Sequence, residues 1–272
     1  MRVATYNIRS CLGTDGKRSV ERIASVIGAL DVDAVALQEV DLVRRRSGDV
    51  NQAERIAGLL GMHCVSCASL SARTGKYGNA VLARRPLTLV RHRALPRARL
   101  SEPRSAMWVR VSGAADARSE GPAGVVNLIN THLSFLRVDR PRQIKDLMGE
   151  RWLGERSLRA GAILCGDLNC TPRDAHFREL AGVLCDVQTE SEGRRGRRPR
   201  KRAGMAGEHA GATWPTRGLT GGPMRALDHI LVTPDIGVER VYVARSREAR
   251  VASDHFPLVA ALRIGGGDAV AG

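Results

Sequence analysis

Apolar and polar residues follow one another in a pattern that predicts strand, helix, strand, helix over residues 2–60. We expect strands at residues 2–8 and 33–37 and helices that begin at Ser19 and Asn51. The first helix carries a continuous apolar stripe, formed by Ile23, Val26, Ile27 and Leu30. Such alternation of strands and helices is typical of an α/β fold.

The remainder of the chain is richer in strands. We expect strands at residues 79–83, 87–90, 106–111, 125–129, 162–165, 226–232, 238–243 and 257–264. A long helix is predicted after Asp139 and Pro141, with Ile144, Leu147, Met148 and Trp152 on one face. A shorter helix is predicted after Thr171, which is interpreted as its N-cap. Residues 112–124 are expected to form an exposed loop.

Two segments lack an apolar pattern. Residues 188–212 are predicted to be a basic, flexible insertion loop, and residues 265–272 a disordered tail. Within the loop, Arg194–Arg202 is a run of basic residues that indicates either an arm drawn to phosphates or an unstructured insertion. Since no linker separates two apolar halves, we expect one catalytic domain over residues 1–264.

The composition points to an anionic partner. The net charge is +15 and the sequence pI about 10.8, which favours nucleic acid, a phospholipid surface or a phosphorylated small molecule. Arginine dominates the basic residues, a bias that genomic codon composition can also produce. No segment is long and apolar enough to span a membrane, no signal peptide is evident, and the six cysteines lack disulfide-framework spacing. We therefore expect a cytoplasmic protein without stable membrane insertion.

A candidate site begins at Gly166-Asp167-Leu168-Asn169, where a buried strand meets its loop. Strand ends of this kind hold catalytic groups in sheet enzymes, although Asp and Asn also form simple turns. The other predicted strands end in comparable polar groups, namely Asn7, Glu39, His132, Asp254 and His255. Their oxygen donors suit Mg²⁺ or Mn²⁺, and the set as a whole suits hydrolysis of a phosphate ester.

Asp228 lies on the same strand face as Ile230 and Val232. A carboxylate on an apolar face needs a partner, and His255 is available before the last predicted strand. The pair could orient a catalytic imidazole or simply brace two strands.

Seven short motifs, in order from residue 5 to residue 258, resemble the endonuclease/exonuclease/phosphatase superfamily. They are TYNIR with Asn7, LQEV with Glu39, YGNAVLAR with Asn79, NTHL with His132, GDLNCTP with Asp167 and Asn169, LDHILV with Asp228, and SDHFPL with Asp254 and His255. The resemblance implies a four-layer α/β sandwich, in which two mixed sheets lie face to face with helices outside, as in deoxyribonuclease I.

The resemblance also implies roles for these residues. Glu39 would bind the metal, with Asn7 and Asp254 close to it, and Asp167 would orient or deprotonate the attacking water. Asn169 and His132 would contact the phosphate, and His255, held by Asp228, would serve as an acid–base group. Contacts of Asn79 and Arg104 with the substrate phosphate are weaker expectations; for Arg104 in Glu102-Pro103-Arg104, a surface turn is the favoured alternative.

The expected substrate is a phosphodiester, with nucleic acid first. The motif differences disfavour a role like that of exonuclease III or an inositol polyphosphate phosphatase. A phospholipid head group or small phosphate ester remains an alternative, and a catalytically silent nucleic-acid-binding protein is a second one. The oligomeric state stays undetermined.

Overall fold

The computed structural model describes residues 1–112, 125–158, 161–193, 211–216 and 224–264. The expected loop at 112–124, apart from its first residue, lies outside these ranges, as do the basic run at 194–202 and the tail at 265–272. Among the described residues, no helix is long and apolar enough to cross a membrane.

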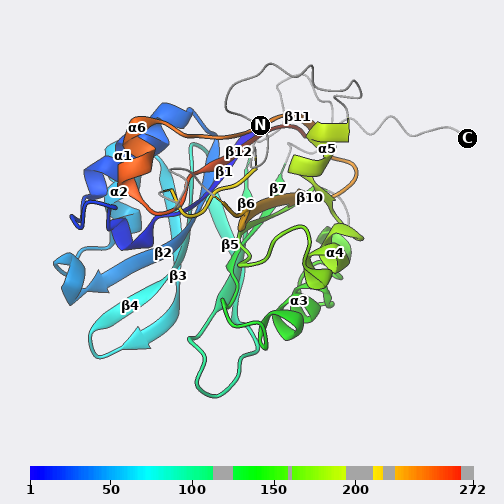
Figure 1. Ribbon diagram of the computed structural model, residues 1–272, viewed down its shortest axis with the longest axis horizontal. Helices are drawn as coiled ribbons and strands as arrows, with labels where there is room; N and C mark the ends of the chain where they lie inside the picture. The colour runs from blue at the N-terminus through cyan, green and yellow to red at the C-terminus, as the bar shows by residue number, and fades with distance from the viewer. Residues whose placement is uncertain (113–124, 159–160, 194–210, 217–223, 265–272) are drawn as a thin grey trace, which may run out of the picture.

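Two six-stranded sheets lie face to face (Figure 1). The first has the order β11-β12-β1-β2-β4-β3 and the second the order β5-β6-β7-β8-β10-β9. The strands of the first sheet are β1 (Arg2–Asn7), β2 (Ala34–Arg44), β3 (His63–Ala72), β4 (Gly75–Ala83), β11 (Gly237–Val243) and β12 (Leu258–Arg263). Those of the second are β5 (Leu87–Ala94), β6 (Ser105–Val111), β7 (Val126–His132), β8 (Ala162–Asp167), β9 (Cys185–Asp186) and β10 (Asp228–Val232).

Both sheets are mixed, because one pair in the centre of each is parallel. β1 runs parallel to β2, and β7 runs parallel to β8, while the other paired strands are antiparallel. The last strand, β12, lies between β11 and β1, so the two ends of the described chain meet in one sheet. The predicted arrangement of two mixed sheets flanked by helices is confirmed.

Helices cover the outer face of each sheet (Figure 1). The first sheet packs against α1 (Val20–Leu30), α2 (Gln52–Leu60) and α6 (Arg247–Ala252), and the second against α3 (Arg140–Met148) and α4 (Ala175–Ala181). A third apolar cluster, which includes Val81, Met107 and Ile230, fills the space between the sheets. Short 3₁₀ helices occupy Arg9–Cys11, Arg45–Ser47 and Arg156–Leu158. The four layers therefore follow from two half-apolar sheets that each need cover on both faces.

Several predicted boundaries are wrong. The helix after Asp139 ends at Met148, because Gly149 leaves the helical conformation, and Trp152 is buried beyond its end. The helix after Thr171 begins later, at Ala175, since Asp174 accepts hydrogen bonds from both the amide and the hydroxyl of Thr171 in a preceding turn.

The expected insertion loop begins instead as a helix, α5 (Val187–Gly193). Val187 is fully buried in the cluster between the sheets, and the Asp186 carboxylate accepts hydrogen bonds from the amide of Gln188 and the hydroxyl of Thr189. One apolar anchor and one capping acid thus suffice for a helix in a polar segment.

Candidate active site

A pocket of about 540 Å³ lies where the edges of the two sheets meet. Most of the predicted site residues line it, namely Glu39, Arg104, His132, Asp167, Asn169, Asp254 and His255. Asn7 and Asp228 lie behind this lining, each hydrogen-bonded to a residue in it. Segments far apart in the sequence therefore converge on one cavity.

The second sheet sets the position of Asp167 through its register. Asp167 ends β8 between two neighbours, His132 at the end of parallel β7 and Asp228 at the start of antiparallel β10. Gly166, just before it, has φ +149°, and the carbonyl of Thr131 occupies the space that a Cβ would need. Only glycine fits there, so β7 and β8 can approach closely enough to place His132 beside Asp167.

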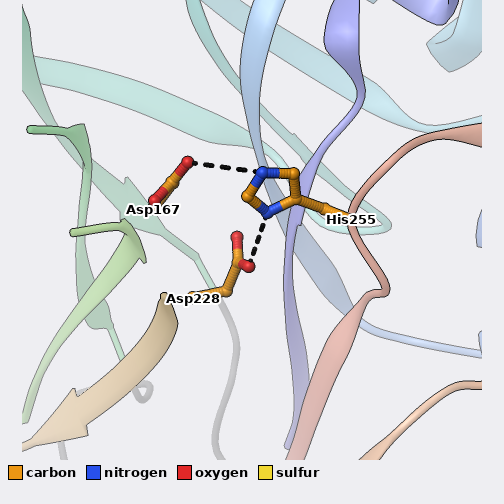
Figure 2. A group of neighbouring side chains, drawn as sticks. All are labelled: Asp167, Asp228 and His255. Carbon is orange, nitrogen blue, oxygen red and sulfur yellow. Dashed lines mark hydrogen bonds and ion pairs between the residues drawn. The ribbon is translucent and has the colours of Figure 1, made fainter. Parts of the chain in front are cut away.

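Asp228, His255 and Asp167 form a buried chain of charged groups (Figure 2). The Nδ1 atom of His255 lies 2.8 Å from Oδ2 of Asp228, and its Nε2 atom lies 3.8 Å from Oδ2 of Asp167. Asp228 is fully buried, and its Oδ1 accepts no hydrogen bond within the described part of the chain. Among the described residues, the imidazole of His255 is therefore the hydrogen-bond partner of this carboxylate.

The pKa shifts follow from this arrangement. Burial raises the pKa of Asp167, although the charge of His255 opposes the shift. Burial alone would lower the pKa of His255, but the two carboxylates on either side of its ring outweigh burial and raise it above the usual value. The imidazole of His255 thus holds a proton firmly between two acids.

His132 and Asn169 form the neighbouring wall. The Asn169 amide nitrogen donates to the carbonyl of Leu133 at 2.9 Å and lies 3.1 Å from Nε2 of His132. Burial, with added repulsion from Arg104 and His255, holds the pKa of His132 well below its usual value. His132 is therefore neutral near pH 7, unlike His255, and the two histidines differ in charge within one pocket.

Glu39 reaches the pocket through an irregularity in β2. The pairing of β2 with β4 shifts register between Leu37 and Val40, and Glu39 has φ +57°. The side chain amide of Asn7 then donates to Oε1 of Glu39 and to Oδ2 of Asp167, both at 3.0 Å. The β-bulge thus turns the Glu39 side chain into the pocket, whereas regular alternation along β2 would not fix it in that direction.

Asp254 lies at the pocket edge with its side chain 29% exposed. Its Oδ2 lies 3.7 Å from Nε of Arg9 and accepts a hydrogen bond from the indole of Trp214 at 3.4 Å. Ser253, one residue earlier, donates to the carbonyl of Asn7 at 2.8 Å and so fixes this loop against the end of β1.

Glu39 offers the kind of oxygen atom that a hard divalent ion prefers. Within the described ranges, Oε2 of Glu39 accepts no hydrogen bond, whereas Oδ1 of Asn7 accepts the amide hydrogen of Arg9 and Oδ2 of Asp254 faces Arg9 and Trp214. Asp167, Asp228 and His255 form the one group of acids and histidines in the described ranges whose potential ligand atoms lie within 4.8 Å of one another.

Arg104 is buried rather than placed in a surface turn. It is 5% exposed, lines the pocket, and pairs with Glu102 at 3.3 Å through its guanidinium, while its buried Nε has no partner among the described residues. The surface-turn interpretation was therefore wrong. Asn79, by contrast, is not a lining residue; its amide donates to the carbonyl of Ser105 and links β4 to β6. We assign it to the junction of the sheets.

The sequence interpretation missed several lining residues, chiefly Phe135, Arg137, Arg140, Trp214 and Arg225. Most lie in connections without periodicity. The one signal available was Trp214 itself, a large aromatic residue in an otherwise polar stretch.

The comparisons with known proteins agree with this geometry. Residues 4–255 match the model of the endonuclease/exonuclease/phosphatase family. The chain belongs to this family. A search of curated proteins found no match.

Solved structures of this endonuclease/exonuclease/phosphatase fold are similar over nearly the whole chain. A family protein from Bacteroides thetaiotaomicron has a TM-score of 0.71 and 20% identity, with 98% of each chain covered. A mannosyl-6-phosphatase from the same organism has a TM-score of 0.69 and 21% identity, covering 96% of this chain and 99% of that one. The human Nocturnin catalytic domain, with a bound sulfate anion, has a TM-score of 0.66 and 17% identity, covering 96% and 92%.

At these identities the structural likeness shows the fold alone, while the family match extends to chemistry. Members of the endonuclease/exonuclease/phosphatase family are hydrolases of phosphoester bonds. The pocket lining combines acids with arginine and histidine side chains.

Proposed function

We propose that this protein is a divalent-metal-dependent phosphodiesterase. The observation that carries the proposal is the buried chain Asp228–His255–Asp167. Asp167 also accepts a hydrogen bond from the side-chain amide of Asn7, which donates a second one to Glu39. A merely structural Asp–His pair would not need a second carboxylate beside the same ring at the bottom of a pocket.

Each residue is assigned a role from its position. Glu39, with Asn7 and Asp254, would hold Mg²⁺ or Mn²⁺. When bound, the ion would neutralise charge on the phosphate and lower the pKa of a water molecule bound to the ion. Asp167 orients the attacking water and accepts its proton. His255, kept protonated and aligned by Asp228, donates to the phosphoryl oxygen or to the leaving group.

The opposite wall positions the phosphate. Neutral His132 and Asn169 lie on this wall, and Arg104 adds a fixed positive charge whose Nε has no hydrogen-bond partner among the described residues. A buried guanidinium is already partly desolvated, so its attraction for an anion is stronger than that of a surface arginine.

Nucleic acid is the first substrate to test, because the net charge of +15 favours a polyanion. A phospholipid head group is the second candidate, since the exposed apolar side chain of Phe135 lines the pocket. The similarity to a mannosyl-6-phosphatase keeps a small phosphate ester in the assay set. A single domain over residues 1–264 and a cytoplasmic location stay predictions.

The test is hydrolysis by the purified protein with Mg²⁺, Mn²⁺ or EDTA. The substrates are plasmid DNA, RNA oligomers, sphingomyelin, phosphatidylglycerol, inositol phosphates and a chromogenic diester and monoester pair. We expect turnover of a diester that EDTA abolishes and that either ion restores. Absence of turnover on every substrate would instead support a catalytically silent nucleic-acid-binding protein.

Variants separate this site from a contaminating activity. Asp167→Asn and His255→Gln should each lower turnover by about 10²–10⁴-fold, the usual effect of losing a general acid–base group. His176→Gln is the matched control, because His176 lies 39% exposed on α4 and pairs only with Glu179 among the described residues. Equal activity in His255→Gln and His176→Gln would contradict the assignment.

A further inference from the structure

Three large apolar side chains are exposed beside the pocket. Leu100 is 97% exposed, Phe135 63% and Val138 56%. Leu100 lies in the connection from β5 to β6, which projects beyond the sheets at the bottom of Figure 1, and the other two lie between β7 and α3. Phe135 also lines the pocket, so the apolar group continues into its mouth.

The two connections form one surface rather than two independent loops. The amide of Ala98 donates to the buried carboxylate of Asp139 at 2.7 Å, and the side chain of Gln143 donates to the carbonyl of Pro96 at 3.1 Å. Arg140 donates to the carbonyl of Phe135 at 2.7 Å. These bonds hold the backbones of the two connections against each other, so little backbone entropy is lost if the surface binds a partner.

The exposed charges within residues 96–101 and 134–138 are positive. Arg97, Arg99 and Arg137 are exposed, and residues 96–101 and 134–138 contain no acid. Of the two acids that directly follow these segments, Asp139 is fully buried and hydrogen-bonded, whereas Glu102 is exposed and pairs with the guanidinium of Arg104. We call Arg97, Arg99, Leu100, Phe135, Arg137 and Val138 the rim surface.

The combination of aliphatic and cationic side chains on the rim surface fits an anionic lipid bilayer better than nucleic acid. Nucleic acid would use the arginines and could stack a base on Phe135, but Leu100 and Val138 offer it neither stacking nor hydrogen bonds. An anionic bilayer uses both kinds of side chain, since aliphatic groups enter the acyl boundary while arginines contact the lipid phosphates. The exposure of Leu100 is therefore better explained by a lipid surface.

We propose that the rim surface docks the protein on an anionic phospholipid membrane. Docking there places the mouth of the pocket at the level of the head groups, because Phe135 and Arg137 belong both to the rim surface and to the pocket lining. The docking itself does not depend on the proposed reaction; only a phospholipid substrate would rest on both.

Binding to vesicles tests the proposal. The full chain is sedimented, in EDTA, with vesicles of phosphatidylcholine alone or of phosphatidylcholine mixed with phosphatidylglycerol. We expect binding to the mixed vesicles only. Leu100→Ser/Val138→Ser should weaken it by about tenfold or more, and Arg99→Gln by about fivefold.

The matched controls are Leu59→Ser and Arg85→Gln, an exposed leucine on α2 and an exposed arginine between β4 and β5. Both should bind like the unchanged protein. Equal binding by Leu100→Ser/Val138→Ser, or no binding of the unchanged protein to mixed vesicles, would overturn the proposal. So would tight binding of duplex DNA that depends on Arg99 while vesicles remain unbound.

A second readout separates this proposal from the proposed function. Hydrolysis of a soluble chromogenic diester should be unchanged in Leu100→Ser/Val138→Ser, whose altered residues do not line the pocket. Conversely, Asp167→Asn should lose hydrolysis and keep vesicle binding. Loss of one property without the other identifies which of the two proposals fails.

Discussion

A single buried carboxylate illustrates what can be inferred at the residue scale. Asp228 stands out in the sequence because it shares a strand face with Ile230 and Val232, and the structure places its Oδ2 2.8 Å from His255. The reasoning succeeded because an unpaired buried charge is too unfavourable to persist, so a partner had to exist.

Asp228→Asn tests whether this carboxylate positions His255. Turnover should fall by about 10²-fold or more, with little change in KM, since Asp228 does not line the pocket. The pKa of His255 should fall toward its usual value, because Asp228 is the foremost of the groups that raise it. Steady-state kinetics and NMR titration of the ring measure the two effects.

A purely structural role for Asp228 predicts a different result. The variant would then unfold at a lower temperature while the folded fraction kept its kcat. An unchanged kcat in folded protein would contradict the positioning role.

The site residues that were predicted and those that were missed differ in where they lie. Asp167, His132 and Glu39, which were predicted, end or interrupt strands, where alternation shows the position even without the fold. Phe135, Trp214 and Arg225 reach the pocket from irregular connections, whose path depends on contacts such as that of Arg140 with the carbonyl of Phe135. No local pattern encodes such a path.

At the scale of elements, strands with fully buried residues were predicted best. β8, whose residues are all buried, matches the predicted strand closely, whereas β3 was missed, because it is a half-exposed edge strand of small and polar residues. α6 was also missed, since its six residues bury only Ala249 and Ala252. Short or exposed elements have too few apolar positions to show a period.

The contact between β7 and β8 gives a prediction at this scale. Gly166→Ala should lower the free energy of unfolding by about 3 kcal/mol or more, because a Cβ would collide with the carbonyl of Thr131 at a φ of +149°. Urea denaturation measures the change. Activity should fall as well, since Asp167 is the next residue.

Gly58→Ala serves as the comparison. Gly58 lies within α2, and no atom lies within 4 Å of the position its Cβ would take. We expect this variant to be unchanged or more stable by about 0.5–1 kcal/mol, because alanine favours the helix. Equal destabilisation by both substitutions would show that close packing at Gly166 is not the cause.

At the scale of the whole molecule, Asn130 makes several hydrogen bonds from one sheet to the other. Asn130 in β7 is fully buried, donates to the carbonyls of Leu37 and Ala80, and accepts the amide of Gln38 at 2.8 Å. The partners lie in β2 and β4 of the opposite sheet. This network specifies how the sheets align, which apolar packing alone leaves less defined.

Asn130→Ala should lower the free energy of unfolding by about 3 kcal/mol, because three buried partners lose their hydrogen bonds at once. Asn51→Ala is the control; it removes only the N-cap of α2 and should cost about 1 kcal/mol. Chemical denaturation compares them. Similar losses in both variants would argue against a special role for the inter-sheet network.

The pairing of the sheets could not be derived from periodicity. Alternation predicted many strands and their buried faces, but the order of β12 between β11 and β1 depends on contacts across the entire chain. Only the ordered motifs, through their resemblance to a known family, indicated that two sheets face each other. Local patterns report local burial, whereas strand order is a property of the complete chain.

The late position of His255 has a consequence for synthesis of the protein on the ribosome. His255 immediately precedes β12, which must pair with β1 before the first sheet is complete. A nascent chain that has released Asn7, Glu39 and Asp167 still lacks this imidazole. The growing polypeptide should therefore stay inert toward phosphoesters until nearly all of the described chain has left the exit tunnel.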